Sequence, residues 1–178
     1  MTIEENSKWG REKREKIDDD LEADMYEFIC LKAKELGYRH YEVSNFTKDR
    51  ASKHNLHYWN YDDYCGLGPG AASKIGLERY ENTRNIQEYF NHPHQRTIIK
   101  LSQQDEAFER IMMGLRVDEG LNLEDFKLKT SIDLVKQYQA IIEKHLSNGH
   151  LVINSAQLQT TELGREQLHD IFVDFMLD

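Results

Sequence analysis

The most informative part of this chain is HNLHYWNY at residues 54–61, together with the glycine-rich GLGPGAAS at residues 66–73. Two histidines, two tyrosines and a tryptophan fall within eight positions, and the second stretch opens with three glycines in five residues. Large rings lose rotamer freedom when they are ordered, whereas glycine lets the backbone approach a ligand closely. The pattern indicates a pocket for a flat, partly polar ligand, and the alternative is a buried aromatic cluster on two strands.

Length and composition limit the class of protein. The 178 residues are enough for one or two domains with a hydrophobic core. No apolar run approaches the roughly 18 residues of a spanning helix, and residues 1–16 lack the apolar centre of a signal peptide. The two cysteines, Cys30 and Cys65, form neither a disulfide framework nor a C-x-x-C pair. These features predict a cytoplasmic protein that reaches a membrane only through its partners.

The first hundred residues predict a mixture of helices and strands. Residues 1–17 are highly charged without helical periodicity and are predicted to be a flexible segment. Apolar residues spaced three or four apart predict an amphipathic helix over 19–36, which Gly37 ends. Alternation over 38–46 predicts a strand. Further elements are predicted as a hairpin over 74–81 turned at Gly76, a short helix over 82–90 and a strand over 97–101.

From residue 102 the pattern becomes mainly helical. Ser102 and Asp105 have the spacing of a capping box at the start of a helix. Further elements are predicted as a helix over 121–128, a helix capped by Ser131 that ends at Asn148-Gly149, strands over 151–153 and 158–160, and a last helix from Thr161. This order is typical of a winged helix. The net charge of −9 and the mixed charges of the 131–147 helix argue against nucleic-acid binding, which needs a basic face.

Three stretches resemble the second half of the oxygen-independent coproporphyrinogen III oxidase-like proteins, a family of radical S-adenosylmethionine (SAM) proteins. They are YEVSNF at 41–46, HNLHYW at 54–59 and GLGPGAAS at 66–73. The H-N-x-x-Y-W pattern is similar to the heme chaperone branch of that family. The resemblance implies an α/β (α+β) fold, with the C-terminal part of a partial triosephosphate-isomerase-type barrel over 18–101. A helical, winged-helix-like domain is then expected over 102–178.

The resemblance also implies where ligands bind. Heme is expected at His54, Asn55, Tyr58 and Trp59, with His54 projecting from a loop as an axial iron ligand. A neutral imidazole nitrogen binds heme iron well. His57 falls at a variable position of the pattern and is the weaker candidate. In the full-length parent protein the SAM side is expected to include Asn45, Phe46, Thr47, Gly66, Gly68 and Gly70. No catalytic residue is assigned.

The chain also departs from the family pattern. It lacks the C-x-x-x-C-x-x-C motif whose three thiolates hold the [4Fe–4S] cluster, and Cys30 and Cys65 cannot replace it. Thr47 and Pro69 stand where alanine is usual, and Ala72 where histidine is common. We therefore expect a C-terminal fragment whose parent carries the cluster and SAM, and which runs no radical chemistry alone. The open edge of its partial barrel is expected to be covered by a second copy, by loops or by crystal contacts.

Three functions remain open from the sequence. The first is a heme chaperone that passes heme or a porphyrin to an acceptor protein. The second is a true oxygen-independent coproporphyrinogen III oxidase of heme biosynthesis. The third is a non-catalytic protein-interaction module built on the winged-helix-like end. A heme absorption band would distinguish the first from the third, and activity on coproporphyrinogen would distinguish the first from the second.

Overall fold

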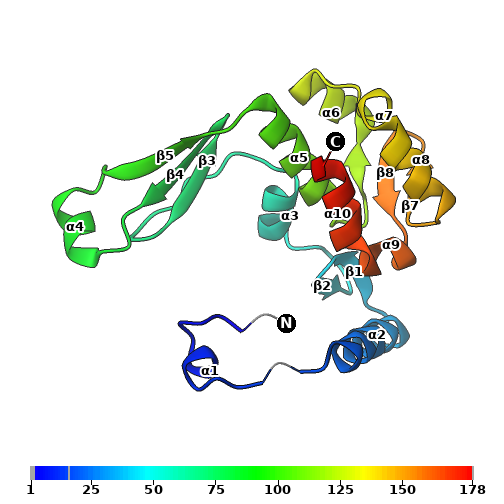
Figure 1. Cartoon of the computed structure of the whole chain (residues 1–178), viewed down its shortest axis with the longest axis horizontal. Helices are drawn as coiled ribbons and strands as arrows, with labels where there is room; N and C mark the ends of the chain where they lie inside the picture. Colours follow the sequence, from blue (N-terminus) through cyan, green and yellow to red (C-terminus); the bar gives the residue numbers. More distant parts are fainter. Residues whose placement is uncertain (1–2, 16, 178) are drawn as a thin grey trace. The chain divides into compact units, whose positions relative to one another are not determined.

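The computed structural model describes residues 3–15 and 17–177 (Figure 1). Helices and strands are both present, which confirms the α+β class. The chain divides into two compact units, one made of residues 1–40 and 44–50 and the other of residues 41–43 and 51–178. The division into 1–17, 18–101 and 102–178 that the sequence suggested stays a prediction.

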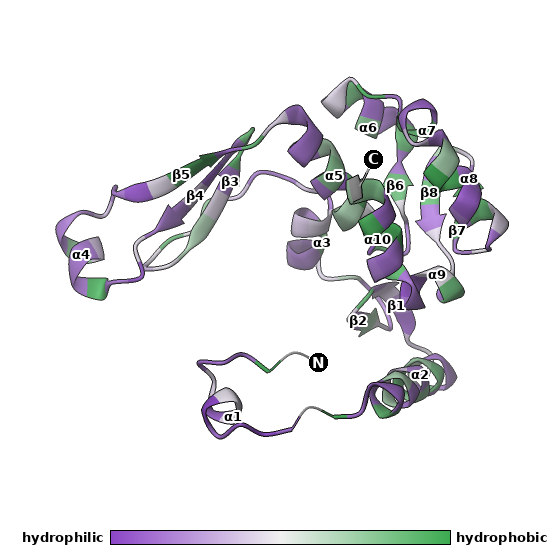
Figure 2. Cartoon of the chain, in the orientation of Figure 1, coloured by the Kyte–Doolittle hydropathy of each residue, from purple (hydrophilic) through white to green (hydrophobic). Residues whose placement is uncertain are grey.

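The first unit contains two helices. Residues 1–17 were predicted to be flexible, and residues 1, 2 and 16 of that segment lie outside the described part. Within the segment, Ser7 caps the one-turn helix α1 (Lys8–Arg11). The predicted amphipathic helix is confirmed as α2 (Asp19–Glu35), which Asp18 caps and after which Gly37 has a φ of +78°. The apolar side chains of α2 are about half exposed or more, and the helix is banded green in Figure 2. They are Leu21, Met25, Phe28, Ile29 and Leu31.

The single strand predicted over 38–46 is wrong. The chain forms β1 (Arg39–Glu42) and β2 (Asn45–Thr47), which pair as a two-stranded sheet around a turn at residues 43–44. Ser44 and Asn45 are residue types that favour turns. Alternation of apolar and polar residues continues through such a short turn, so the pattern alone did not reveal the reversal.

The second unit begins with a short helix and an antiparallel sheet. Helix α3 (Lys53–Trp59) precedes a three-stranded meander of β3 (Ala72–Ile75), β4 (Glu78–Asn82) and β5 (Arg96–Lys100) (Figure 1). Gly76, with a φ of +56°, turns the first pair, and α4 (Ile86–Asn91) connects the second. The hairpin, short helix and strand predicted here are confirmed. The partial barrel over 18–101 stays a prediction, because the described sheets in this range have two and three strands.

The C-terminal helices surround a second three-stranded sheet. Its strands β6 (Leu121–Asn122), β8 (Gln157–Thr160) and β7 (Leu151–Asn154) pair antiparallel in that order. The helices are α5 (Gln103–Gly114), α6 (Leu123–Thr130), α7 (Leu134–Gln137), α8 (Gln139–Ser147), α9 (Glu162–Glu166) and α10 (Leu168–Leu177). The capping box of Ser102 and Asp105 is present, as predicted. The apolar core includes Ala107, Ile111, Leu115, Phe126, Leu134, Ile142, Leu151, Leu158, Ile171 and Phe175.

One helix start in this part was predicted wrongly. Ser131 has a φ of +60° and ends α6 instead of capping the next helix. Asp133 caps α7 by accepting a hydrogen bond from the Lys136 amide, and the helical path then bends at Tyr138 before α8. Serine and aspartate are both good N-caps, so the sequence offered two equivalent starts.

A buried histidine links α8 to α10. The imidazole of His145 is 2% exposed, and its Nε2 lies 2.8 Å from Asp174 Oδ2. Its Nδ1 lies 3.1 Å from Nδ1 of His150. Burial lowers the pKa of His145 below its ordinary value, although Asp174 opposes that shift. The hydrogen bond from Lys144 lowers the pKa of Asp174, so this carboxylate stays ionised at the pH where the histidine titrates.

We expect the chain to lose stability as the pH falls from about 7.5 to 5.5, because the unfolded state binds a proton that folded His145 resists. The stabilisation is complete above the ordinary histidine pKa of about 6.5 and falls by at most about 1.4 kcal/mol per pH unit. Urea unfolding at the two pH values measures the change. His145→Gln should reduce the difference in unfolding free energy between the two pH values. His169→Gln, at an exposed position, should leave that difference unchanged. Equal pH dependence in all three proteins would contradict the role of His145.

Candidate functional site

The HNLHYWNY stretch forms helix α3, where the sequence predicted a loop for His54. The hydroxyl of Ser52 caps the helix by accepting a hydrogen bond from the Asn55 amide at 3.3 Å. Serine before a run of helix-compatible residues is a helix-start signal that could have revealed this element. Because residues four apart share a helix face, His54 and Tyr58 lie together, and Asn55 and Trp59 form a second pair.

The first pair is exposed. His54 and Tyr58 contact each other edge to face, with ring centres 5.0 Å apart. Tyr64 contacts Tyr58 in turn at 4.9 Å, so three rings form a row. Within the described part of the chain, neither ring nitrogen of His54 has a hydrogen-bond partner. The structure therefore leaves a nitrogen lone pair of His54 available to a ligand.

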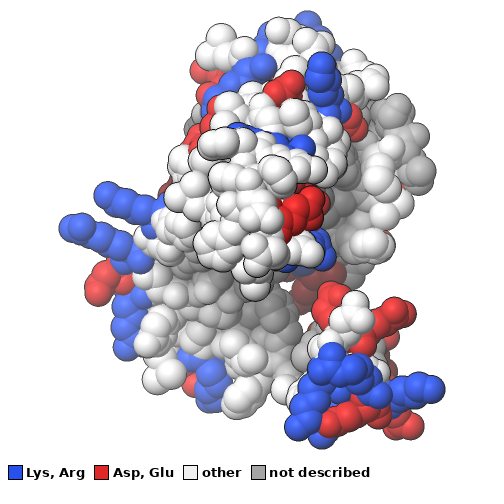
Figure 3. All heavy atoms as spheres, turned by 90° about the vertical axis from the view of Figure 1, so that its left-hand side faces the viewer, with Lys and Arg blue, Asp and Glu red and all other residues white. Residues whose placement is uncertain are grey.

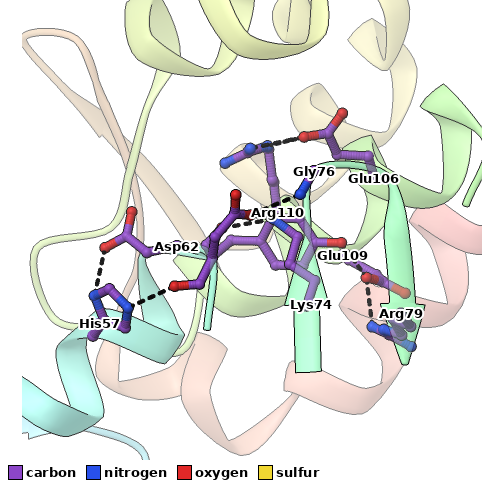
Figure 4. Close-up of polar contacts among 10 residues, drawn as sticks. His57, Asp62, Lys74, Gly76, Arg79, Glu106, Glu109 and Arg110 are labelled. Carbon is purple, nitrogen blue, oxygen red and sulfur yellow. Dashed lines mark hydrogen bonds and ion pairs between the residues drawn. The ribbon is translucent and has the colours of Figure 1, made fainter. Parts of the chain in front are cut away.

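His57 lies on the same helix but has both ring nitrogens engaged (Figure 4). Its Nδ1 lies 3.2 Å from the Asp62 carboxylate and its Nε2 lies 2.9 Å from the Asp63 carbonyl oxygen. These contacts attach the helix to the loop that follows it. A metal ion could bind His57 only after one of them is lost.

The second pair, Asn55 and Trp59, faces the rest of the unit. The side-chain amide of Asn55 donates a hydrogen bond through Nδ2 to the Tyr41 hydroxyl at 3.2 Å. Trp59 lies beside the Arg116 guanidinium, and it also borders a cavity of about 370 Å³ together with Tyr61 and Phe126. Of the four residues predicted to bind heme, two are thus exposed and two anchor the helix.

A buried aromatic and ionic cluster follows α3 (Figure 4). The ring of Tyr61 is 6% exposed and is contacted by two cations, Lys74 at 4.1 Å and Arg110 at 4.8 Å from the ring centre. The Tyr61 hydroxyl donates to Glu109, which also pairs with Arg79 at 2.6 Å. Burial, reinforced by the neighbouring Glu109, raises the pKa of Tyr61, so the phenol stays protonated.

Lys74 extends this cluster toward the loop after α3. Its ammonium is 4% exposed and donates to the Tyr61 carbonyl oxygen at 3.2 Å and to Asp63 at 3.0 Å. The hydrogen bond from Lys74 lowers the pKa of Asp63. These contacts join the loop after α3 to β3 and α5, and Arg79 adds a contact from β4 to α5. The cluster therefore attaches the loop that follows α3 to the sheet and to the first helix of the C-terminal part.

The glycine-rich loop is bonded within the hairpin region. The amide of Gly66 donates to the Ser73 hydroxyl at 3.0 Å, that of Gly68 to the Tyr89 hydroxyl at 3.2 Å, and that of Gly70 to the Thr83 carbonyl oxygen at 2.9 Å. Gly68 and Gly70 have φ values of +105° and +70°. Turn geometry and hairpin packing thus account for these glycines, and their contact with SAM stays a prediction.

The other residues predicted for the SAM side lie in β2, in the first unit. Phe46 stacks on His40, with ring centres 4.3 Å apart and planes 15° from parallel. The Thr47 hydroxyl donates to the Arg50 carbonyl oxygen at 2.8 Å. Asn45 is exposed. Their predicted role in cofactor binding remains a prediction as well.

The residues of this chain do not fit an iron–sulfur cluster. Such a cluster with an open iron takes three cysteine thiolates, and the chain has two cysteines, Cys30 on α2 and Cys65 before the glycine loop. Within residues 3–15 and 17–177 no group of three or more histidine, cysteine or carboxylate side chains is placed to hold a metal ion. No described helix has the length and apolarity to cross a membrane.

The face shown in Figure 3 carries charges of both signs. Basic and acidic side chains are interspersed on it, with white, uncharged surface between them.

Comparisons with known proteins find relatives of one kind, HemN-like proteins and HemW heme chaperones. Residues 101–166 match the model of the HemN C-terminal domain. The heme chaperone HemW of Lactococcus lactis subsp. lactis (strain IL1403) is 35% identical over 90% of this chain and 43% of that protein. HemW of Bacillus subtilis (strain 168) is 28% identical over 87% of this chain and 42% of its own length. The chain thus spans about two fifths of the length of these relatives.

One solved structure shares the fold. The coproporphyrinogen III oxidase HemN of Escherichia coli, a radical SAM enzyme, superposes with a TM-score of 0.67 at 16% sequence identity. The match covers 89% of this chain and 41% of the HemN chain. At this identity the likeness concerns the fold alone, and it supports the mixed helix and sheet architecture described above.

Proposed function

We propose that this chain, which belongs to the HemN-like radical SAM family and corresponds to the C-terminal portion of its HemW branch, binds heme at α3 and passes it to an acceptor protein. The observation that carries this proposal is the exposed imidazole of His54, whose ring nitrogens have no hydrogen-bond partner among the described residues. Relatives that are named heme chaperones support it.

Each named residue of the H-N-x-x-Y-W pattern on α3 then has a distinct role in binding heme. Heme would supply an iron that accepts a nitrogen lone pair, and the imidazole of His54 would donate one. Tyr58 and Tyr64 offer ring edges and faces beside that nitrogen. Asn55 and Trp59 hold α3 on its protein side, so that the orientation of His54 is fixed before heme arrives. A single exposed histidine ligand suits a protein that must also release heme.

Titrating hemin into the 178-residue chain tests the proposal. We expect a saturable Soret band, and we expect His54→Ala to weaken binding at least about tenfold, equivalent to about 1.4 kcal/mol. The band maximum should also shift, because the iron loses its protein ligand. His94→Ala is the control, because it removes an exposed histidine that lies outside α3, and it should stay within about twofold of the wild type.

Two results would contradict the proposal. Unchanged affinity and spectrum in His54→Ala would remove His54 from the site. A wild-type chain that is folded by circular dichroism but gives no saturable band would leave the interaction module as the better function. The coproporphyrinogen oxidase alternative has support from the fold alone.

A further inference from the structure

Arg116 lies between the signature helix and the last helix of the chain. Its guanidinium carbon is 5.8 Å from the centre of the Trp59 ring and 4.8 Å from the centre of the Phe172 ring on α10. Its Nη1 donates to the Met112 carbonyl oxygen at 2.9 Å. A planar cation over an aromatic face is attracted by the ring quadrupole, so these contacts orient the Trp59 indole.

The backbone around Arg116 is held by the strand that also anchors Asn55. The Val43 amide donates to the Arg116 carbonyl oxygen at 3.1 Å, and the Asp118 amide donates to the Tyr41 carbonyl oxygen at 3.1 Å. Glu42, between them, has an exposed fraction of 0%. Burial lowers the pKa of Arg116, and the charge of Glu42 raises it. The half-buried guanidinium therefore has a buried carboxylate as its electrostatic partner.

We infer that Arg116 is a positioning residue for the heme site, which fixes Trp59 and thereby the orientation of α3 and of His54. The inference rests on the proposed function. Asn55 attaches one turn of α3 to Tyr41, and Trp59 attaches the next turn to Arg116. Residues 41–43 and 116–118, to which the two turns are attached, are hydrogen-bonded to each other. The rotation of α3 about its own axis is therefore fixed. That rotation determines where the exposed His54 imidazole points.

The shape of the guanidinium is the essential property. Lysine keeps the positive charge near Glu42 but lacks the flat surface that contacts Trp59 and Phe172 together. Arg116→Lys therefore separates positioning from charge. It should leave the chain folded, change the surroundings of the Trp59 indole, and weaken heme binding although His54 is intact.

The experiment uses the full chain with Trp9→Phe, so that Trp59 is the one tryptophan that fluoresces. In Arg116→Lys we expect Trp59 emission to shift to longer wavelength without hemin. In the hemin titration we expect about fivefold weaker affinity, which converts to about 1 kcal/mol. Circular dichroism at the same temperature verifies that both proteins are folded.

Arg96→Lys is the matched control, because Arg96 also lies over a ring, that of Tyr80 at 5.0 Å, but on β5. It should leave both Trp59 emission and heme affinity unchanged. Unchanged emission and affinity in Arg116→Lys would overturn the inference, and so would an equal effect of Arg96→Lys. If His54→Ala does not alter heme binding, the proposed function fails. The emission readout still decides whether Arg116 positions Trp59, since it needs no heme.

Discussion

Phe126→Ala should lower the free energy of unfolding by about 3–5 kcal/mol, the range for removing a large aromatic side chain from a packed core. Phe126 lies on α6, is 1% exposed and belongs to the apolar core beside Ile111 and Leu115. Alanine at this position leaves a cavity that the surrounding helices fill only in part, so the lost contacts are not regained. Urea unfolding followed by circular dichroism measures the change.

Leu128→Ala is the control for this prediction. Leu128 lies two residues further along the same helix and is 84% exposed, so its truncation removes little packing. Its effect should stay within about 0.5 kcal/mol, as for other surface substitutions. Similar losses in the two variants would show that the core is not centred where the structure places it.

Gly164→Ala should destabilise the chain by about 3 kcal/mol, at the upper end of the cost of overpacking. A Cβ atom at this position would lie 1.9 Å from the carbonyl oxygen of His150, which is backbone and cannot rotate away. Helix α9 cannot move aside easily, because Thr161 caps it and also donates to the Gly149 carbonyl oxygen at 2.7 Å. The midpoint of thermal unfolding should therefore fall clearly.

The neighbouring Leu163→Ala provides the comparison. Leu163 is 49% exposed on the same helix, and alanine there removes surface contacts without adding an atom near His150. We expect its unfolding midpoint to lie close to that of the wild type. A Gly164→Ala protein as stable as Leu163→Ala would mean that α9 and the His150 turn are further apart than described.

Much of the fold could be predicted because its signals are local. The 19–36 helix, the Ser102 capping box and the hairpin at Gly76 each depend on residues within a few positions of one another. The turn at residues 43–44 was missed because alternation continues through it. The start at Ser131 was wrong because Asp133, two residues later, caps equally well. Local patterns thus identify elements better than they separate neighbouring ones.

The residues proposed for the candidate site could be named from the sequence, whereas their arrangement could not. The signature identifies His54, Asn55, Tyr58 and Trp59, but their division into an exposed pair and an anchoring pair follows from the helical path of α3. Arg116 was not predicted as a site residue, because its partners Trp59 and Phe172 are more than fifty residues away in opposite directions along the chain. No spacing rule connects residues that only the folded core brings together.

The bonding of residues 41–43 to residues 116–118 has a consequence during translation. Ribosomes add roughly 5–20 residues per second, so the earlier segment emerges several seconds before its partner. Over that interval α3 has neither the Arg116 contact nor the neighbouring C-terminal helices. If heme binds at α3 as proposed, nascent chains should become competent to bind it only once synthesis has passed Arg116 and α10.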